Sequence, residues 1–307
     1  MTRCFQELTR RSLLQTVACG FGSIALAGLE NANAQPSSSL LAKPPLFPQR
    51  AKRIIFIFMA GGPSHVDTFD YKPELFAKDG KEIDFVGVRT NTFGKASKRI
   101  LMKPLWEFKR YGECGQFVSS LFPNIAKHVD DLAFIHSMHT EGVAHGPSTL
   151  FMHTGATNLV RPSMGSWISY GLGTENQNLP AFVTISPSAS KGGPRNYSNA
   201  FLPSIHQGTA IGHSGNVSGA KIKNIDNAML SDAQRENRFG LLQSLNRVQA
   251  GSSLDGNLEA TISNYELAWR MQMEAPELAD LSKETAATKS IYGIDEKYTD
   301  DFGKQCL

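Results

Sequence analysis

The sequence predicts an α/β fold with a parallel sheet, and three observations support this class. Residues 54–60 (IIFIFMA) form an unbroken apolar run, which is typical of a strand covered on both faces. A four-residue apolar spacing from Gln116 to Val129 predicts a helix, although Pro123 complicates its start. Residues 132–136 (LAFIH) then predict a second short buried strand. Strand, helix and strand in this order make a β-α-β unit.

The N-terminal residues 1–34 are predicted to be a removable export signal. Residues 9–14 (TRRSLL) form a twin-arginine pattern, a moderately apolar run follows, and small residues at 32–34 suit cleavage after Ala34. A membrane anchor is the less favoured alternative, because the run is weaker than the roughly 20 apolar residues of a spanning helix. We therefore expect export to the periplasm or another extracytoplasmic compartment, without a stable membrane span.

The composition is that of an ordinary globular protein: 41% of the residues are hydrophobic, 19% are charged, and the net charge is +3. Such a small net charge argues against a nucleic-acid partner, which needs a strong positive field. Cys114 and Cys306 are the two cysteines beyond the signal, and neither has the spacing of a zinc or redox motif. We interpret them as unpaired thiols; a single disulfide bond in an oxidising compartment is the alternative.

Further elements are predicted on both sides of a long loop. Ser163 is a predicted N-cap of a short helix that stops at Gly171. Ser231 and Gln234 form a capping box at the start of another helix. The predicted segments are a flexible lead-in over 35–50, a helix over 163–171, a strand over 181–185, a surface loop over 191–220, and helices over 231–248 and 258–273 with apolar stripes.

The loop that leaves the first strand, residues 61–70 (GGPSHVDTFD), is the first candidate site. In α/β proteins ligands usually bind where a strand ends. His65, Asp67 and Asp70 could converge on a divalent cation, and these ligands do not distinguish zinc, calcium and magnesium. The structural alternative is that Ser64 or Asp67 caps the following turn and that His65 is simply hydrogen-bonded.

The second candidate site, residues 137–155 (SMHTEGVAHGPSTLFMHTG), begins where the second predicted strand ends, so it should lie at the same edge of the sheet. His145 precedes a predicted helix N-terminus, a natural anion site, and could act as ligand, base or nucleophile. Thr140 is an alternative hydroxyl nucleophile. The structural alternative is a hydrogen-bonded histidine beside a turn. The candidate substrate-binding residues are Ser148, His139 and His153.

Three segments are long and specific enough to indicate a family. They are residues 58–70 (FMAGGPSHVDTFD), residues 145–155 (HGPSTLFMHTG), and residues 162–167 (PSMGSW) with 173–180 (GTENQNLP). The sequence resembles the DUF1501 family of exported bacterial proteins of uncharacterised function. That family is similar to the alkaline phosphatase and sulfatase superfamily. The resemblance implies an α/β/α sandwich with a mostly parallel sheet, and metal-assisted ester hydrolysis at the strand C-termini.

The resemblance carries two departures in residues 145–155. This segment has the frame of the sulfatase signature, but His145 stands at the nucleophile position and Thr149 at the arginine position. Without Cys or Ser there is no formylglycine, so ordinary sulfatase chemistry is not expected. The superfamily's remaining metal ligands belong to a C-terminal half, which we expect to lie beyond Leu307. Residues 51–307 would then be the N-terminal part of a C-terminally truncated domain.

Two functions from different classes remain. The leading hypothesis is an exported metal-dependent hydrolase of a phosphate or sulfate ester, small or polymeric, with His65, Asp67 and Asp70 as ligands and His145 at the nucleophile position. The rival is a non-catalytic periplasmic binding or scaffold protein that has kept the sandwich and lost the chemistry. The histidine at position 145 and the expected truncation favour the rival. The oligomeric state is not predicted.

Overall fold

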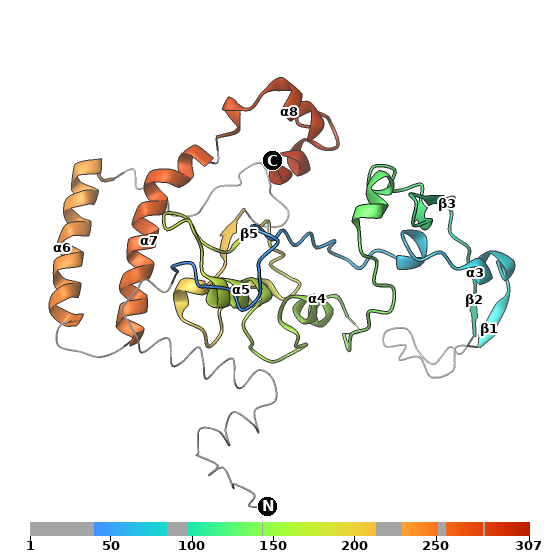
Figure 1. Cartoon of the computed structure of the whole chain (residues 1–307), viewed down its shortest axis with the longest axis horizontal. Coiled ribbons are helices and arrows are strands. Elements are labelled where there is room, and N and C mark those ends of the chain that lie inside the picture. The colour runs from blue at the N-terminus through green and yellow to red at the C-terminus, as the bar shows by residue number, and fades with distance from the viewer. Residues whose placement is uncertain (1–39, 85–97, 143, 213–228, 251–255, 279) are drawn as a thin grey trace, which may run out of the picture.

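A computed structural model describes residues 40–84, 98–142, 144–212, 229–250, 256–278 and 280–307. Figure 1 shows a part with short strands at one end of the molecule, a central part around α4, α5 and β5, and the long helices α6 and α7 at the other end. The elements of the first part are η1 (His65–Asp67), α3 (Pro73–Ala77), β1 (Glu82–Asp84), β2 (Lys98–Ile100), β3 (Phe108–Tyr111), β4 (Gln116–Ser119) and η2 (Ile125–Asp131). The remaining elements are α4 (His145–Thr154), α5 (Met164–Leu172), β5 (Val183–Ile185), η3 (Gly193–Tyr197), η4 (Ser204–His206), β6 (Thr209–Ile211), α6 (Asp232–Ala250), α7 (Gly256–Leu278), η5 (Leu281–Lys283), α8 (Ala286–Ile291) and α9 (Asp300–Cys306).

The first part contains two antiparallel strand pairs, β1 with β2 and β3 with β4. In the second pair Phe108 lies opposite Ser119 and Tyr111 lies opposite Gln116. The second pair and η2 enclose a small core of Val118, Ala126 and Val129. Partly buried aromatic residues pack around this core: Phe69, Tyr111, Phe122 and Phe134.

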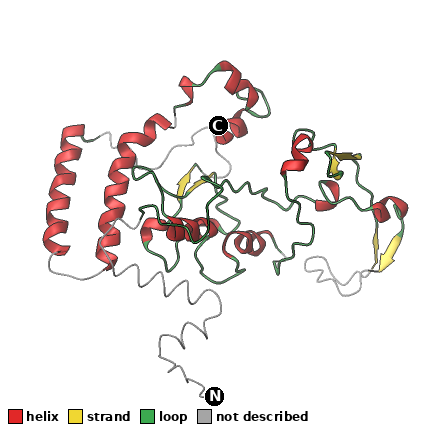
Figure 2. Ribbon diagram, in the orientation of Figure 1, coloured by secondary structure: helices red, strands yellow, loops and turns green. Residues whose placement is uncertain are grey.

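The predicted strand over residues 54–60 is wrong for this structure. The segment forms neither helix nor strand (Figure 2). Ile55 and Ile57 within it are each 84% exposed. A strand needs a neighbour for its backbone N–H and C=O groups. Among the described residues no segment pairs with this run. The apolar run therefore has the composition of a strand, but composition does not show which segment would pair with it.

The rest of the predicted β-α-β unit is also wrong. Residues 116–119 form β4 instead of the start of a helix, and the 3-10 helix η2 begins only at Ile125. Pro123 lacks a backbone N–H, which disfavours a helix through this position. Before it, residues 116–119 satisfy their backbone hydrogen-bonding groups by pairing with β3. Residues 132–136 are loop rather than strand. Tertiary pairing has overridden the four-residue spacing here.

The central part confirms two sequence predictions. Val183–Ile185 is a strand, β5, and it pairs in parallel with β6, so that Val183 lies opposite Thr209 and Ile185 opposite Ile211. Ser163 is the N-cap of α5, and its hydroxyl accepts a hydrogen bond from the backbone N–H of Ser166. The helix ends at Leu172, with Gly173 as its C-cap. The 191–220 segment is not a plain loop where it is described, since it contains η3, η4 and β6.

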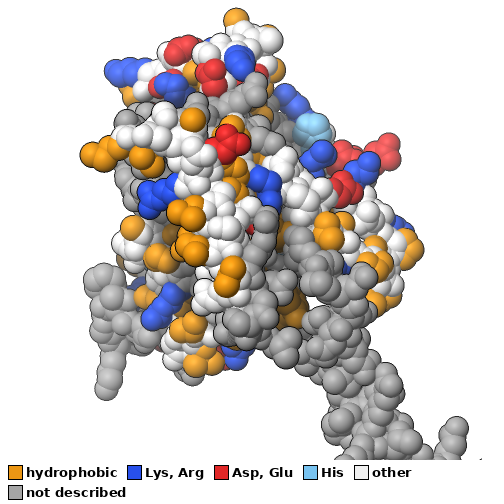
Figure 3. All heavy atoms as spheres, turned by 90° about the vertical axis from the view of Figure 1, so that its left-hand side faces the viewer, with side chains coloured by type: hydrophobic (Ala, Val, Ile, Leu, Met, Phe, Trp, Pro, Cys, Tyr) orange, Lys and Arg blue, Asp and Glu red, His pale blue; other side chains and the backbone are white. Residues whose placement is uncertain are grey.

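The helices α6 and α7 lie side by side and confirm the two predicted long helices (Figure 1). The Phe239 ring stacks on Trp269 with centroids 4.8 Å apart, and Gln243 Nε2 donates to Glu266 Oε1. The predicted apolar stripe of the 231–248 helix is not buried along its whole length, since Leu245 and Val248 are exposed. Hydrophobic side chains are scattered over this end of the molecule among Lys and Arg (Figure 3).

The architecture is thus a mixed α/β arrangement of helices and short sheets, with one parallel pair among the described residues. A second core joins the central part to α7 through Leu40, Ile205, Leu267 and Met271. Within the described part of the chain, none of the helices has the length and apolar character that crossing a membrane requires.

Candidate functional site

The loop at residues 64–70 is a compact, hydrogen-bonded turn. Thr68 is buried, and its hydroxyl donates to the carbonyl oxygens of Ser64 (3.1 Å) and His65 (3.2 Å). The backbone N–H groups of Phe69 and Asp70 also donate to the His65 carbonyl. The Ser64 side chain does not cap η1, so this structural alternative is wrong for Ser64. The His65 carbonyl accepts hydrogen bonds from several donors and so organises the turn.

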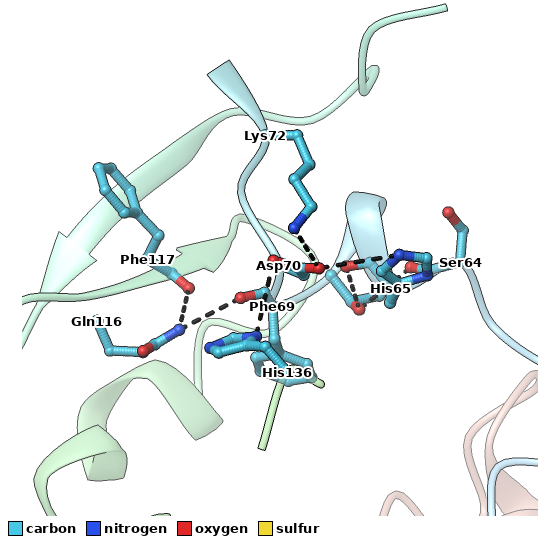
Figure 4. A network of polar contacts seen from close by, with 9 residues as sticks. Ser64, His65, Phe69, Asp70, Lys72, Gln116, Phe117 and His136 are labelled. Atoms are coloured by element: carbon cyan, nitrogen blue, oxygen red, sulfur yellow. Dashed lines mark hydrogen bonds and ion pairs between the residues drawn. The ribbon is translucent and has the colours of Figure 1, made fainter. Parts of the chain in front are cut away.

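Strand β4 holds this turn in place through hydrogen bonds to its carbonyl oxygens. The backbone N–H of Ser119 donates to the Thr68 carbonyl at 2.9 Å. Gln116 Nε2 donates to the carbonyl oxygens of Phe69 (3.2 Å) and Phe117 (3.1 Å), as Figure 4 shows. The loop and β4 are far apart in the sequence, and these hydrogen bonds join them. They therefore fix the position of the backbone beside Asp70.

The Asp70 carboxylate is the centre of a group of four charged or titratable side chains, which we call the Asp70 cluster: His65, Asp70, Lys72 and His136. Lys72 Nζ lies 2.9 Å from Asp70 Oδ2. His65 Nε2 lies 3.8 Å from the same oxygen, and His136 Nδ1 lies 3.7 Å from Oδ1 (Figure 4). Only 14% of the Asp70 side chain is exposed, whereas its three partners are more accessible. The carboxylate is therefore flanked by two imidazoles and one ammonium.

His136 is the residue that sequence reasoning missed. It comes from the loop after η2, and its ring stacks on Phe134. Phe134 packs against the small core and also contacts the Phe69 ring. The available signal was a polar residue at the end of an apolar run, directly before the second candidate segment. As the last residue of the predicted strand over 132–136, it was not among the candidate ligands.

The structure brings together two of the three predicted metal ligands. His65 and Asp70 belong to the Asp70 cluster, whereas Asp67 lies in η1 and is not one of its members. Two imidazoles and one carboxylate are the donor set of several catalytic zinc sites, so the chemistry of the cluster fits a divalent cation. As the side chains lie, however, the described residues contain no group of three or more His, Cys, Asp or Glu arranged to hold a metal ion. Lys72 instead supplies the positive charge beside Asp70.

The second candidate segment forms the predicted helix, α4, which begins at His145. His145 is exposed, as is His139. The Thr140 hydroxyl accepts a hydrogen bond from the backbone N–H of Gly142 (3.2 Å), and Gly142 lies close against Ser148. Thr140 and Ser148 thus both lie beside Gly142. Among the described contacts, no hydrogen bond or ion pair joins this segment to the Asp70 cluster.

His153 connects α4 to the apolar run that precedes the loop. Its ring makes edge-on contacts with Phe56 (5.4 Å between centroids) and Phe58 (4.9 Å). Burial lowers the pKa of His153, because a charged imidazole would lose its hydration there. The second candidate segment therefore contacts the apolar run before the first candidate loop through aromatic packing at His153, not through the residues predicted to react.

Comparison with known proteins gave one result. The family model described as "Protein of unknown function (DUF1501)" matches residues 51–307. Neither the curated proteins nor the solved structures gave a match. The matched region contains the apolar run, the Asp70 cluster, α4 and both long helices. Because it covers most of the sequence, the chain belongs to the DUF1501 family.

Proposed function

We propose that this protein is an exported, metal-dependent hydrolase of phosphate or sulfate esters whose metal-binding residues are His65, Asp70 and His136. The observation that carries the proposal is the position of the Asp70 carboxylate, which has one histidine nitrogen within 4 Å of each oxygen. The proposal replaces Asp67 of the predicted ligand set with His136. Two imidazole nitrogens and one carboxylate suit zinc better than calcium or magnesium, which take oxygen ligands.

Each residue of the cluster has a role in this proposal. A bound divalent cation would polarise the ester and lower the pKa of a water molecule. Asp70 supplies the negative charge, and Gln116 fixes the backbone beside it through the Phe69 carbonyl. Lys72 neutralises Asp70, and an ammonium here also attracts an anionic phosphate or sulfate group. His145 and Thr140 remain proposed reacting groups.

The second candidate function is a non-catalytic binding or scaffold protein of the cell envelope. The 2.9 Å ion pair between Lys72 and Asp70 favours it, because the carboxylate already has a cationic partner. In this case His65 and His136 only complete a local charge network. The two candidates differ in whether a metal ion can replace Lys72 at Asp70.

Titration calorimetry of the purified protein with zinc, calcium and magnesium salts separates them. For the hydrolase, we expect Asp70→Asn to weaken binding of the preferred metal at least about tenfold, since it removes the only carboxylate of the set. Asp67→Asn is the matched control and should bind like the wild type. Lys72→Met should bind the metal more tightly, because it removes the competing cation.

Hydrolysis of p-nitrophenyl phosphate and p-nitrophenyl sulfate, each with the preferred metal, provides the second readout. Asp70→Asn should lose hydrolysis and Asp67→Asn should keep it. A wild type that binds none of the three metals and hydrolyses neither ester would refute the hydrolase. The binding or scaffold function would then be the better conclusion.

Export is a separate part of the proposal, and the twin-arginine pattern at residues 9–14 supports it. Replacement of Arg10 and Arg11 by lysine keeps the charge but removes the pattern. We expect the wild type in the extracytoplasmic fraction of a bacterial host and the double variant in the cytoplasm. Equal export of both proteins would contradict the twin-arginine route.

A further inference from the structure

A buried serine–histidine pair lies outside the Asp70 cluster, where η4 meets α5. His206 is 1% exposed and Ser169 is 2% exposed. Ser169 Oγ lies 2.8 Å from His206 Nδ1, and the Tyr170 ring stands edge-on to the imidazole. Within the described residues, His206 Nε2 is buried and has no hydrogen-bond partner. A protonated imidazole has an N–H on both nitrogens, so it would bury one N–H that nothing accepts.

The segment Leu40–Lys43, here called the strap, crosses the end of α5 beside this pair. The backbone N–H of Lys43 donates to the Leu172 carbonyl at 2.9 Å, and the N–H of Thr174 donates to the Leu40 carbonyl at 2.8 Å. Leu40 is fully buried in a core that also contains Ile205, the residue before His206. The strap and His206 are therefore held by the same packing.

The charge around His206 is positive. Lys43 Nζ donates to the Tyr170 carbonyl at 2.6 Å and lies over the Tyr170 ring. Burial, and then the charge of Lys43, lower the pKa of His206 to about 4. Burial lowers the pKa of Lys43 as well.

No other element packed on η4 supplies an opposing charge among the described residues. On α7, Asn264 bonds to Ser204, while Leu267 and Met271 are apolar. Arg270 of the same helix donates to the Gln177 carbonyl, and Glu266 accepts from Gln243. On α5 the neighbours of His206 are Ser169 and the Tyr170 ring. Among the residues whose side chains the structure describes, no carboxylate is therefore placed to stabilise an imidazolium at His206.

We propose that His206 is an acid-sensitive latch: protonation of its imidazole opens the contact between η4 and α5 and releases the strap from the end of α5. Opening hydrates the new cation and its unpaired N–H, and it moves the cation away from Lys43. At neutral pH the uncharged ring keeps the latch closed. The latch is independent of the metal proposed at Asp70.

Hydrogen exchange at the backbone amides of Lys43 and Thr174 tests the latch, because these two amides make the strap's hydrogen bonds. After correction for intrinsic exchange rates, we expect their protection in the wild type to fall about 100-fold between pH 7 and pH 4. His206→Asn keeps a polar side chain but removes the titration, so its protection should change little. His128→Asn, at an exposed histidine, should keep the full fall.

Two results would overturn the proposal: an unchanged protection in the wild type at pH 4, or the same fall in His206→Asn. If His206→Asn does not fold, two other experiments test the latch: the Lys43→Met variant and NMR titration of His206 in the wild type. Lys43→Met should raise the pKa of His206 and shrink the fall. A His206 ring that titrates together with the exposed histidines would overturn the latch, while titration near pH 4 would support it.

Discussion

At the scale of single residues, the candidate site depends on how Asp70 is held. The carboxylate is mostly shielded from solvent, yet its partners are exposed side chains that can rearrange around it. The backbone next to it is fixed by two interactions that no sequence pattern announces: the Thr68 carbonyl bonded to Ser119, and the Phe69 carbonyl bonded to Gln116. Substitution of Gln116 therefore tests whether these interactions position Asp70.

Replacement of Gln116 by leucine should lower the free energy of unfolding by about 1–2 kcal/mol, because the carbonyls of Phe69 and Phe117 lose their donor in a partly buried place. Urea unfolding followed by circular dichroism measures this. The matched control is Gln305→Leu, where the amide makes one long bond on an exposed helix. Equal, small effects of both substitutions would show that Gln116 does not hold the loop.

Gly112 supports the turn between β3 and β4, and Gly112→Ala should destabilise the protein by about 1–3 kcal/mol. Its φ is +66°, and an added Cβ would collide with the Asp130 carboxylate. That carboxylate accepts from the backbone N–H groups of Cys114 and Glu113, which lower the pKa of Asp130. Gly80→Ala is the control, with a similar φ and open space around the new methyl. Thermal melts should show the larger loss for Gly112→Ala.

At the scale of secondary-structure elements, local signals predicted helices better than strands, of which only β5 was predicted correctly among the described residues. The helices α5, α6 and α7 were predictable, because caps and helical spacing lie within the helix itself. Residues 54–60 and 132–136 have strand-like composition, but a strand exists only with a partner, which sequence spacing does not provide. The β3–β4 pair shows the reverse case: residues with a helical spacing became a strand because β3 was available.

The capping box of α6 gives a direct test at this scale. Ser231 Oγ accepts from the N–H of Gln234, and Gln234 Oε1 accepts from the N–H of Ser231. Ser231→Ala should cost about 1 kcal/mol of unfolding free energy, because the N–H of Gln234 loses its side-chain acceptor. Ser244→Ala, on the exposed face of the same helix, should cost much less. The comparison fails if both variants unfold at the same urea concentration.

At the scale of the whole molecule, the site could be predicted in part. The 61–70 loop was found because a turn after an apolar run carries a histidine and two carboxylates. Two features of the cluster were not predictable. Asp67 lies outside it because of the way η1 turns. His136 belongs to it because the loop after η2 returns to Asp70. The contact between α4 and the apolar run was not predictable either, because His153 makes it by packing against an aromatic ring.

His206 gives the whole molecule a pH dependence whose sign follows from its pKa. In the folded protein this pKa lies near 4, below the ordinary value of 6.5. Between these two values the unfolded chain binds a proton that the folded chain does not, so stability falls as the pH falls from about 6.5 to about 4. Other groups titrate in the same range, and we therefore compare the wild type with His206→Asn at each pH.

The difference in unfolding free energy between wild type and His206→Asn should shift by about 3 kcal/mol against the wild type on going from pH 7.5 to pH 4. Urea unfolding at a series of pH values measures it. Most of the shift should have occurred at about pH 4, which is the pKa of the folded imidazole. The shift should be absent above about pH 7.5, because the imidazole is then neutral in both states. A difference that stays constant over this range would mean that His206 titrates equally in the folded and unfolded chain. In that case neither its burial nor the charge of Lys43 would disfavour the imidazolium.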